Sequence, residues 1–177
     1  MSAQQILSIT FGYSDSEDRL WARCVLAGRN ESRFWLTRRL TLALIHTLAE
    51  KLHKTLPALP VPMEDSLRLA MEYQAALEAP ADTAPTRSST TSGHTSAMPL
   101  CHSIDITPSP EKVWGIQWRL ENQQALALSP ERNQVHRVLA ILISRAEAAG
   151  WAPALAEGWL IGEIRETLLG QPPADSP

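Results

Sequence analysis

The stretch Arg19-Leu20-Trp21-Ala22-Arg23-Cys24-Val25-Leu26 alternates two kinds of side chain with a period of two, which predicts a half-buried β-strand. One side of this strand would face a core with Leu20, Ala22, Cys24 and Leu26. The segment Trp114–Leu120 alternates in the same way at an offset of 94 residues. We therefore take this strand as part of a unit that occurs twice.

Matched segments flank the two strands at offsets of 92 to 95 residues. Ser8–Phe11 precedes the first strand as Ser103–Ile106 precedes the second. The helical stripe Leu44, Ile45, Leu48, Leu52 matches Val138, Leu139, Leu142, Ala146. A duplicated unit with small loop insertions leaves this pattern, so we expect an internal duplication.

Each unit is predicted to run β-β-β-α-α. The first has strands at 6–11, 19–26 and 33–36, a helix from the N-cap Thr37 to about Lys54, and a second helix at 63–77. The second has strands at 103–107, 113–120 and 125–128, a helix that starts at Ser129-Pro130-Glu131 and stops at Gly150, and a last helix from 153 to 169.

We expect residues 1–78 to form the first unit, 79–100 a flexible linker, 101–170 the second unit and 171–177 a disordered tail. The linker is rich in Ser, Thr, Pro and Ala, and such a segment buries too little apolar surface to offset the entropy of ordering. The expected fold is α+β, with antiparallel sheets that carry helices on one face. Because one helix layer covers only one face of a sheet, we expect the two units to pair edges or stack as a pseudo-twofold dimer within one chain.

Composition and charge narrow the class of protein. The chain has 177 residues with 44% hydrophobic and 20% charged, which is typical of a globular protein. A net charge of -3 provides no general attraction to nucleic acid or to an anionic membrane. The first residues lack the basic segment of a signal peptide, and no apolar run is long enough to span a membrane. We therefore expect a cytoplasmic protein that does not enter a membrane.

The sequence lacks the common linear motifs of catalytic and phosphate-binding sites. The sequence has no Gly-rich phosphate loop, no HExxH and no Gly-x-Ser-x-Gly. His46 and His53 lie seven residues apart, and Cys101-His102 with His94 lacks zinc-site spacing. We predict no metal and no cofactor, and we read Cys24 as a buried free thiol. An enzymatic site between the two units would need no linear motif, so that alternative stays open.

A cluster of tryptophan and arginine is the candidate partner-binding site. If Leu20 faces the core, then Trp21 and Arg23 face the other way, and so do Arg33 and Trp35 of the next strand. The matched positions of Trp21 and Trp35 in the second unit hold the small residues Gly115 and Ala127. Tryptophan and arginine are enriched in protein-binding hot spots, and aromatic sheet faces also stack nucleic-acid bases. A third interpretation is that the tryptophans pack against the sister sheet.

The leading hypothesis is a non-catalytic protein–protein interaction module, such as an assembly factor or a small subunit of a larger complex. The alternative is a weak single-stranded nucleic-acid-binding protein, and the third is an enzyme with a site between the units. The duplicated strands-then-helix order is similar to that of the Pur family of single-strand-binding modules, but that family uses longer sheets with basic, aromatic-rich faces, so the resemblance is one of architecture alone. The acidic residues Asp15, Glu17 and Asp18 and the net negative charge favour a protein partner.

Overall fold

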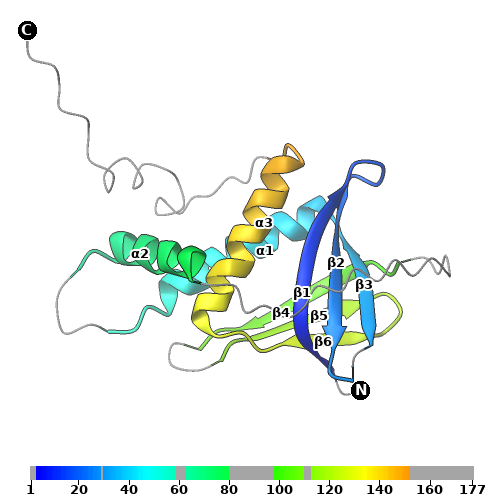
Figure 1. The fold of residues 1–177 in the computed structure, drawn as a ribbon, viewed down its shortest axis with the longest axis horizontal. Coiled ribbons are helices and arrows are strands. Elements are labelled where there is room, and N and C mark those ends of the chain that lie inside the picture. Colours follow the sequence, from blue (N-terminus) through cyan, green and yellow to red (C-terminus); the bar gives the residue numbers. More distant parts are fainter. Residues whose placement is uncertain (1–2, 29, 59–62, 80–97, 110–112, 152–177) are drawn as a thin grey trace, which may run out of the picture.

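The computed structural model describes residues 3–28, 30–58, 63–79, 98–109 and 113–151, and its fold is α+β as predicted (Figure 1). Each half of the chain contributes three strands followed by a long helix. The elements are β1 (Gln4–Ser14), β2 (Arg19–Leu26), β3 (Glu31–Leu36), α1 (Arg38–Lys54), α2 (Asp65–Glu78), β4 (Cys101–Thr107), β5 (Gly115–Leu120), β6 (Ala125–Leu128) and α3 (Arg132–Ala148).

The six strands form one mixed sheet in the order β3-β2-β1-β6-β5-β4. Within each half, neighbouring strands are antiparallel. The halves join where Gln4 and Gln5 of β1 pair in parallel with Leu126 and Ala127 of β6. The two outermost strands also meet, because Trp35 of β3 makes a parallel bridge with Leu100 just before β4. The sheet is therefore strongly curved, with β1–β3 and β4–β6 running in different directions (Figure 1).

The expectation of antiparallel sheets is wrong for the whole molecule, because the two halves share one mixed sheet. Edge pairing satisfies backbone N–H and C=O groups that two separate sheets would leave exposed. The first strand reaches the other half because β1 has 11 residues rather than the predicted six. A bulge between Ile6 and Ser8 shifts the register there and leaves the side chain of Leu7 63% exposed.

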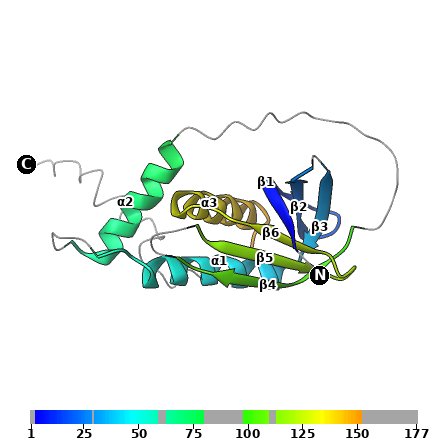
Figure 2. The same ribbon diagram turned by 90° about the horizontal axis from the view of Figure 1, so that it is seen from below.

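Helices α1 and α3 lie side by side against the inner face of the curved sheet (Figures 1 and 2). Helix α2 packs mainly on α3, away from the strands. The predicted inward residues of β2 are all buried, which confirms the period of that strand. The largest fully buried side chains come from both halves and form one core: Trp114, Trp118, Trp151, Phe11, Phe34, Leu20, Leu36, Ile45, Leu48, Leu52, Leu69 and Ile116.

Helix α1 has the predicted boundaries. The hydroxyl of Thr37 accepts the N–H of Leu40 at 3.2 Å, so Thr37 is the N-cap, and the helix ends at Lys54. None of the helices in the described part of the chain is long and apolar enough to cross a membrane.

Helix α3 starts two residues later than the predicted first position, Pro130. Its N-cap is Glu131, which forms a capping box with Gln134. The carbonyl of Pro130 accepts the N–H of Trp114 at 2.8 Å, and this contact keeps Pro130 outside the helix. At the other end, Gly150 has a φ of +68° and stops the helix as predicted.

Several predicted segments lie outside the described residues: most of the linker (80–97), the last helix (153–169) and the tail (171–177). At the end of the expected linker, the carbonyl of Pro99 accepts the N–H of Trp35 at 2.9 Å. The carbonyl of Leu100 accepts the N–H of Glu121 at 3.0 Å. These two bonds tie the entry to β4 to strand β3 of the first half and to the residue that follows β5 in the second half.

Candidate functional site

The outer face, by which we mean Trp21, Arg23, Arg33 and Trp35, lies on β2 and β3 opposite the helix-covered side. Trp21 is paired directly with Trp35, and Arg23 is paired directly with Arg33. Arg33 is exposed and the other three are half-buried, whereas the residues that alternate with them are buried. The structure thus brings all four sequence-predicted residues together on one side of the sheet, with α1 and α3 on the other side (Figure 1).

The indole of Trp21 lies over Gly12 of β1, its cross-strand neighbour. A Cβ atom at Gly12 would be only 2.1 Å from Cζ2 of Trp21, so no other residue fits beneath the ring as it lies. Gly12 is buried although its position in β1 belongs to the outer side of the sheet. This close approach places the Trp21 side chain against the backbone of β1, where only glycine leaves room for it.

The outer face carries a positive surplus that the net charge of the chain does not reveal. Glu31 binds Arg23 through two contacts, one of them Nε to Oε2 at 3.1 Å, and its Oε2 lies 3.8 Å from Nη2 of Arg33. The hydrogen bond from Arg23 lowers the pKa of Glu31, which therefore stays ionised. One carboxylate thus faces two guanidinium groups, and the sequence analysis had not identified Glu31 as their partner.

The matched positions in the second half are built differently. Among the described residues other than its two chain neighbours, only Thr107 has atoms within 4 Å of a Cβ built at Gly115, the counterpart of Trp21. Nearby, Arg119 and Asp105 form an exposed ion pair with Nη2 and Oδ2 2.9 Å apart. Within the described part of the sheet, the matched positions of the second half thus carry no equivalent of the two tryptophans.

A second set of contacts, which the sequence analysis missed, fixes the turn between β1 and β2. Asp18, at a φ of +46°, accepts hydrogen bonds from the Tyr13 hydroxyl at 2.9 Å and from Nε1 of Trp151 at 3.1 Å. The rings of Tyr13 and Trp151 meet edge to face with centroids 5.6 Å apart. These contacts join the end of α3 to the first half across more than 130 residues. No local sequence signal could have shown that pairing.

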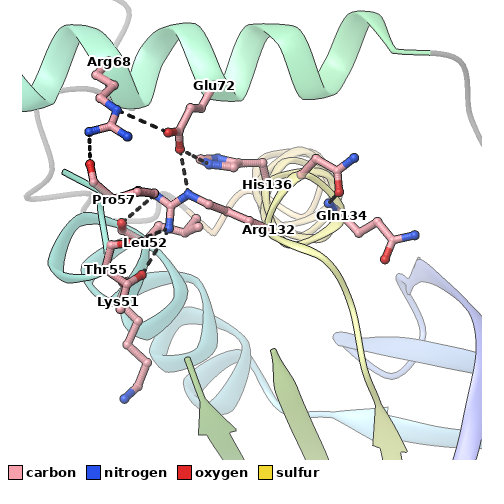
Figure 3. A network of polar contacts seen from close by, with 10 residues as sticks. Lys51, Leu52, Thr55, Pro57, Arg68, Glu72, Arg132, Gln134 and His136 are labelled. Atoms are coloured by element: carbon pink, nitrogen blue, oxygen red, sulfur yellow. Dashed lines mark hydrogen bonds and ion pairs between the residues drawn. The ribbon is translucent and has the colours of Figure 1, made fainter. Parts of the chain in front are cut away.

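Arg132, in the first turn of α3, is the centre of a polar network between the three helices (Figure 3). Its guanidinium donates to the carbonyl of Leu52 at 2.8 Å and to the hydroxyl of Thr55 at 3.1 Å, and pairs with Glu72 of α2 at 2.8 Å. The cation thus binds the last carbonyls of α1, which are otherwise unsatisfied and carry the negative end of the helix dipole. Arg132 holds α1, α2 and α3 together.

Glu72 is the acidic member of the same network. Burial would raise the pKa of Glu72, but hydrogen bonds from His136 and Arg132 outweigh it and keep the pKa below its usual value. His136 Nε2 lies 3.3 Å from Oε2 of Glu72, and its side chain is only 1% exposed. A cavity of about 420 Å³ lies beside these groups. The carboxylate, the histidine and the arginine each bind a residue of another helix, so these contacts link α2 to α3.

Among the described residues, the thiols and histidines form neither a reactive cysteine site nor a metal site. Burial raises the pKa of Cys24 to about 12 and that of Cys101 to about 11, so both thiols stay protonated and weakly nucleophilic at neutral pH. Both cysteines are free. Within the ranges that the structure describes, no three His, Cys, Asp or Glu side chains are grouped so that they could hold a metal ion.

Comparisons of the chain with protein-family models, with curated proteins and with solved structures find no match.

Proposed function

We propose that the protein is a non-catalytic protein–protein interaction module, such as an assembly factor or a small subunit of a larger complex, and that it binds its partner through the outer face. The supporting observation is the pair of cross-strand couples, Trp21 with Trp35 and Arg23 with Arg33, on a sheet side away from the helices. Tryptophan and arginine are the residues that most often dominate binding energy at protein interfaces. The arginine surplus favours a partner surface that combines apolar and acidic groups.

We propose that the two halves arose by duplication and that the outer face evolved afterwards in the first half. Exchange of the halves maps β1, β2 and β3 onto β4, β5 and β6, and it turns the β3–β4 contact into the β6–β1 contact. Both contacts are parallel, which supports a pseudo-twofold relation between the halves. In this view the first half has specialised by acquiring two tryptophans where the second has Gly115 and Ala127. We place the interaction in a reducing compartment such as the cytoplasm, because both cysteines are free and buried.

Affinity enrichment from the native host, with the full chain as bait, tests the proposal. Trp21→Ala and Trp35→Ala should each weaken binding of the enriched partner about 30-fold, which corresponds to roughly 2 kcal/mol at a hot spot. Arg119→Ala is the matched control, because it removes an exposed arginine from the second half of the same sheet. A partner that binds the two tryptophan variants as tightly as the wild type would contradict the proposal.

Single-stranded nucleic acid is the second candidate, because two indoles and a surplus of guanidinium groups on one sheet suit stacked bases and phosphates. A labelled oligonucleotide separates the two candidates. If nucleic acid were the partner, its affinity would fall steeply between 50 and 200 mM salt and would be lost in Trp35→Ala. Because we propose a protein partner, we expect the wild type to bind the oligonucleotide no more tightly than Trp35→Ala does.

A further inference from the structure

We infer that a groove between α1 and the free edge of β4 binds an extended, acidic peptide strand from a partner protein. This inference concerns a surface other than the outer face, so it goes beyond the function proposed above. The groove is about 360 Å³ in volume. Its walls are one side of α1, including Leu40, Ala43 and Lys51, and the strand residues Ile104–Thr107.

Among the residues that the structure describes, nothing pairs with most of the outer edge of β4. On one side β4 is paired with β5 from Cys101 to Thr107. On the other side, the described residues provide only the bridge between Trp35 and Leu100, at the start of the strand. Helix α1 and strand β4 both lead away from this bridge, and α1 lies alongside β4 (Figure 2). A free strand edge beside a helix is the arrangement that binds peptides by adding a strand to the sheet.

The floor of the groove is apolar and incompletely covered. Ile104 and Ile106 lie on the inner side of the sheet, but both are only half-buried. Their cross-strand partners, Trp118 and Ile116, are at most 1% exposed. Ala43 of the opposite wall is exposed. Apolar side chains at alternate positions of an added strand would cover this floor, because alternate residues of a strand point to the same side.

The charged residues that line the groove indicate which kind of peptide it would bind. Two lining residues are charged, Asp105 and Lys51. Asp105 is already paired with Arg119, whereas Lys51 forms no ion pair with another residue that the structure describes. The groove therefore has one uncompensated positive charge, and Lys51 is half-buried there. A carboxylate on the peptide would neutralise it, whereas a basic peptide would be repelled.

The probe for this inference is a random dodecapeptide library displayed on phage and selected against the full chain. Selection should enrich sequences in which apolar residues alternate and an Asp or Glu lies near one end. Synthetic peptides of the enriched sequence should bind Lys51→Glu at least tenfold more weakly than the wild type. They should also bind Ala43→Trp at least tenfold more weakly, because the indole fills the groove.

His46→Trp is the matched control, since His46 is exposed on α1 but does not line the groove. It should bind the peptides as the wild type does, and equal melting temperatures would show that all variants fold. Trp35→Ala should also leave peptide binding unchanged, so failure of the groove and failure of the outer face are distinguishable. Enrichment without acidic residues, or equal binding to Ala43→Trp, would overturn the inference. Self-association of the chain that Ala43→Trp abolishes would assign the groove to a second copy and would also overturn it.

Discussion

Replacement of Trp118 by alanine should lower the free energy of unfolding by about 3–5 kcal/mol, the usual cost of removing a large aromatic side chain from a core. Trp118 lies on β5 in the second half and has no exposed surface. Its ring contacts Phe34 of β3 with centroids 6.3 Å apart, so it packs against the first half as well. Denaturant unfolding followed by circular dichroism should show one transition at a lower midpoint, because both halves lose the same core.

Trp118→Phe is a milder change at the same position, and it tests the shared core if the alanine variant does not fold. Phenylalanine retains most of the ring and removes an indole N–H that has no hydrogen-bond partner among the described residues. We expect a loss of about 1–2 kcal/mol for this change. Two separate unfolding transitions, or an alanine variant as stable as the wild type, would show that the halves do not share a core.

Arg132→Ala should cost about 2–4 kcal/mol of stability. The change removes the ion pair with Glu72 and the bonds to the C-terminal end of α1, and it leaves a partly buried carboxylate without one of its cationic partners. Arg38→Ala is the matched control, because Arg38 is exposed in the first turn of a helix, where a cation is not favoured. Thermal and denaturant unfolding of both variants measure the difference. Equal stability of Arg132→Ala and Arg38→Ala would contradict the role given to the network.

The same network predicts how stability depends on pH. The pKa of Glu72 is lower in the folded chain than its usual value of 4.5, so ionised Glu72 stabilises the fold at pH values above 4.5. This contribution is lost as the pH falls from 4.5 through the folded pKa. Glu72→Gln should therefore be less stable than the wild type at pH 7 and should lose less stability between pH 5 and pH 3. Parallel loss of stability in the two proteins would assign acid sensitivity to other groups.

The faces of the strands could be predicted from the sequence because a strand period of two is a local property. In β2 the apolar positions Leu20 and Leu26 fixed which side is buried, and the outer positions of Trp21 and Trp35 followed without any knowledge of the fold. Helix α1 could also be predicted from the sequence, because its signals are local: the N-cap Thr37 directly precedes the helix, and the apolar stripe lies within it.

The features that could not be predicted depend on contacts between distant residues. Only two residues of β1, Gln4 and Gln5, pair with β6, and two polar residues carry no pattern that identifies a parallel partner. Nothing in the local sequence distinguishes Arg132 from an exposed arginine of a helix. In the structure it binds the carbonyl of Leu52, which lies 80 positions away in the sequence. The start of α3 was misplaced because the Ser-Pro-Glu pattern fits two alternative caps, and a long-range hydrogen bond from Trp114 to Pro130 selects the later one.

The free energy of unfolding of Trp35→Ala decides whether the outer face is a surface available to a partner or part of the packing between the halves. If Trp35 faces a partner, the variant should lose no more than about 1.5 kcal/mol of stability, the range expected for a half-buried side chain on a sheet surface. Its unfolding curve should then lie close to that of the wild type and far from that of Trp118→Ala. A loss of roughly 3–5 kcal/mol, equal to that of Trp118→Ala, would mean that Trp35 belongs to the core and would contradict the assignment of the outer face as a binding surface.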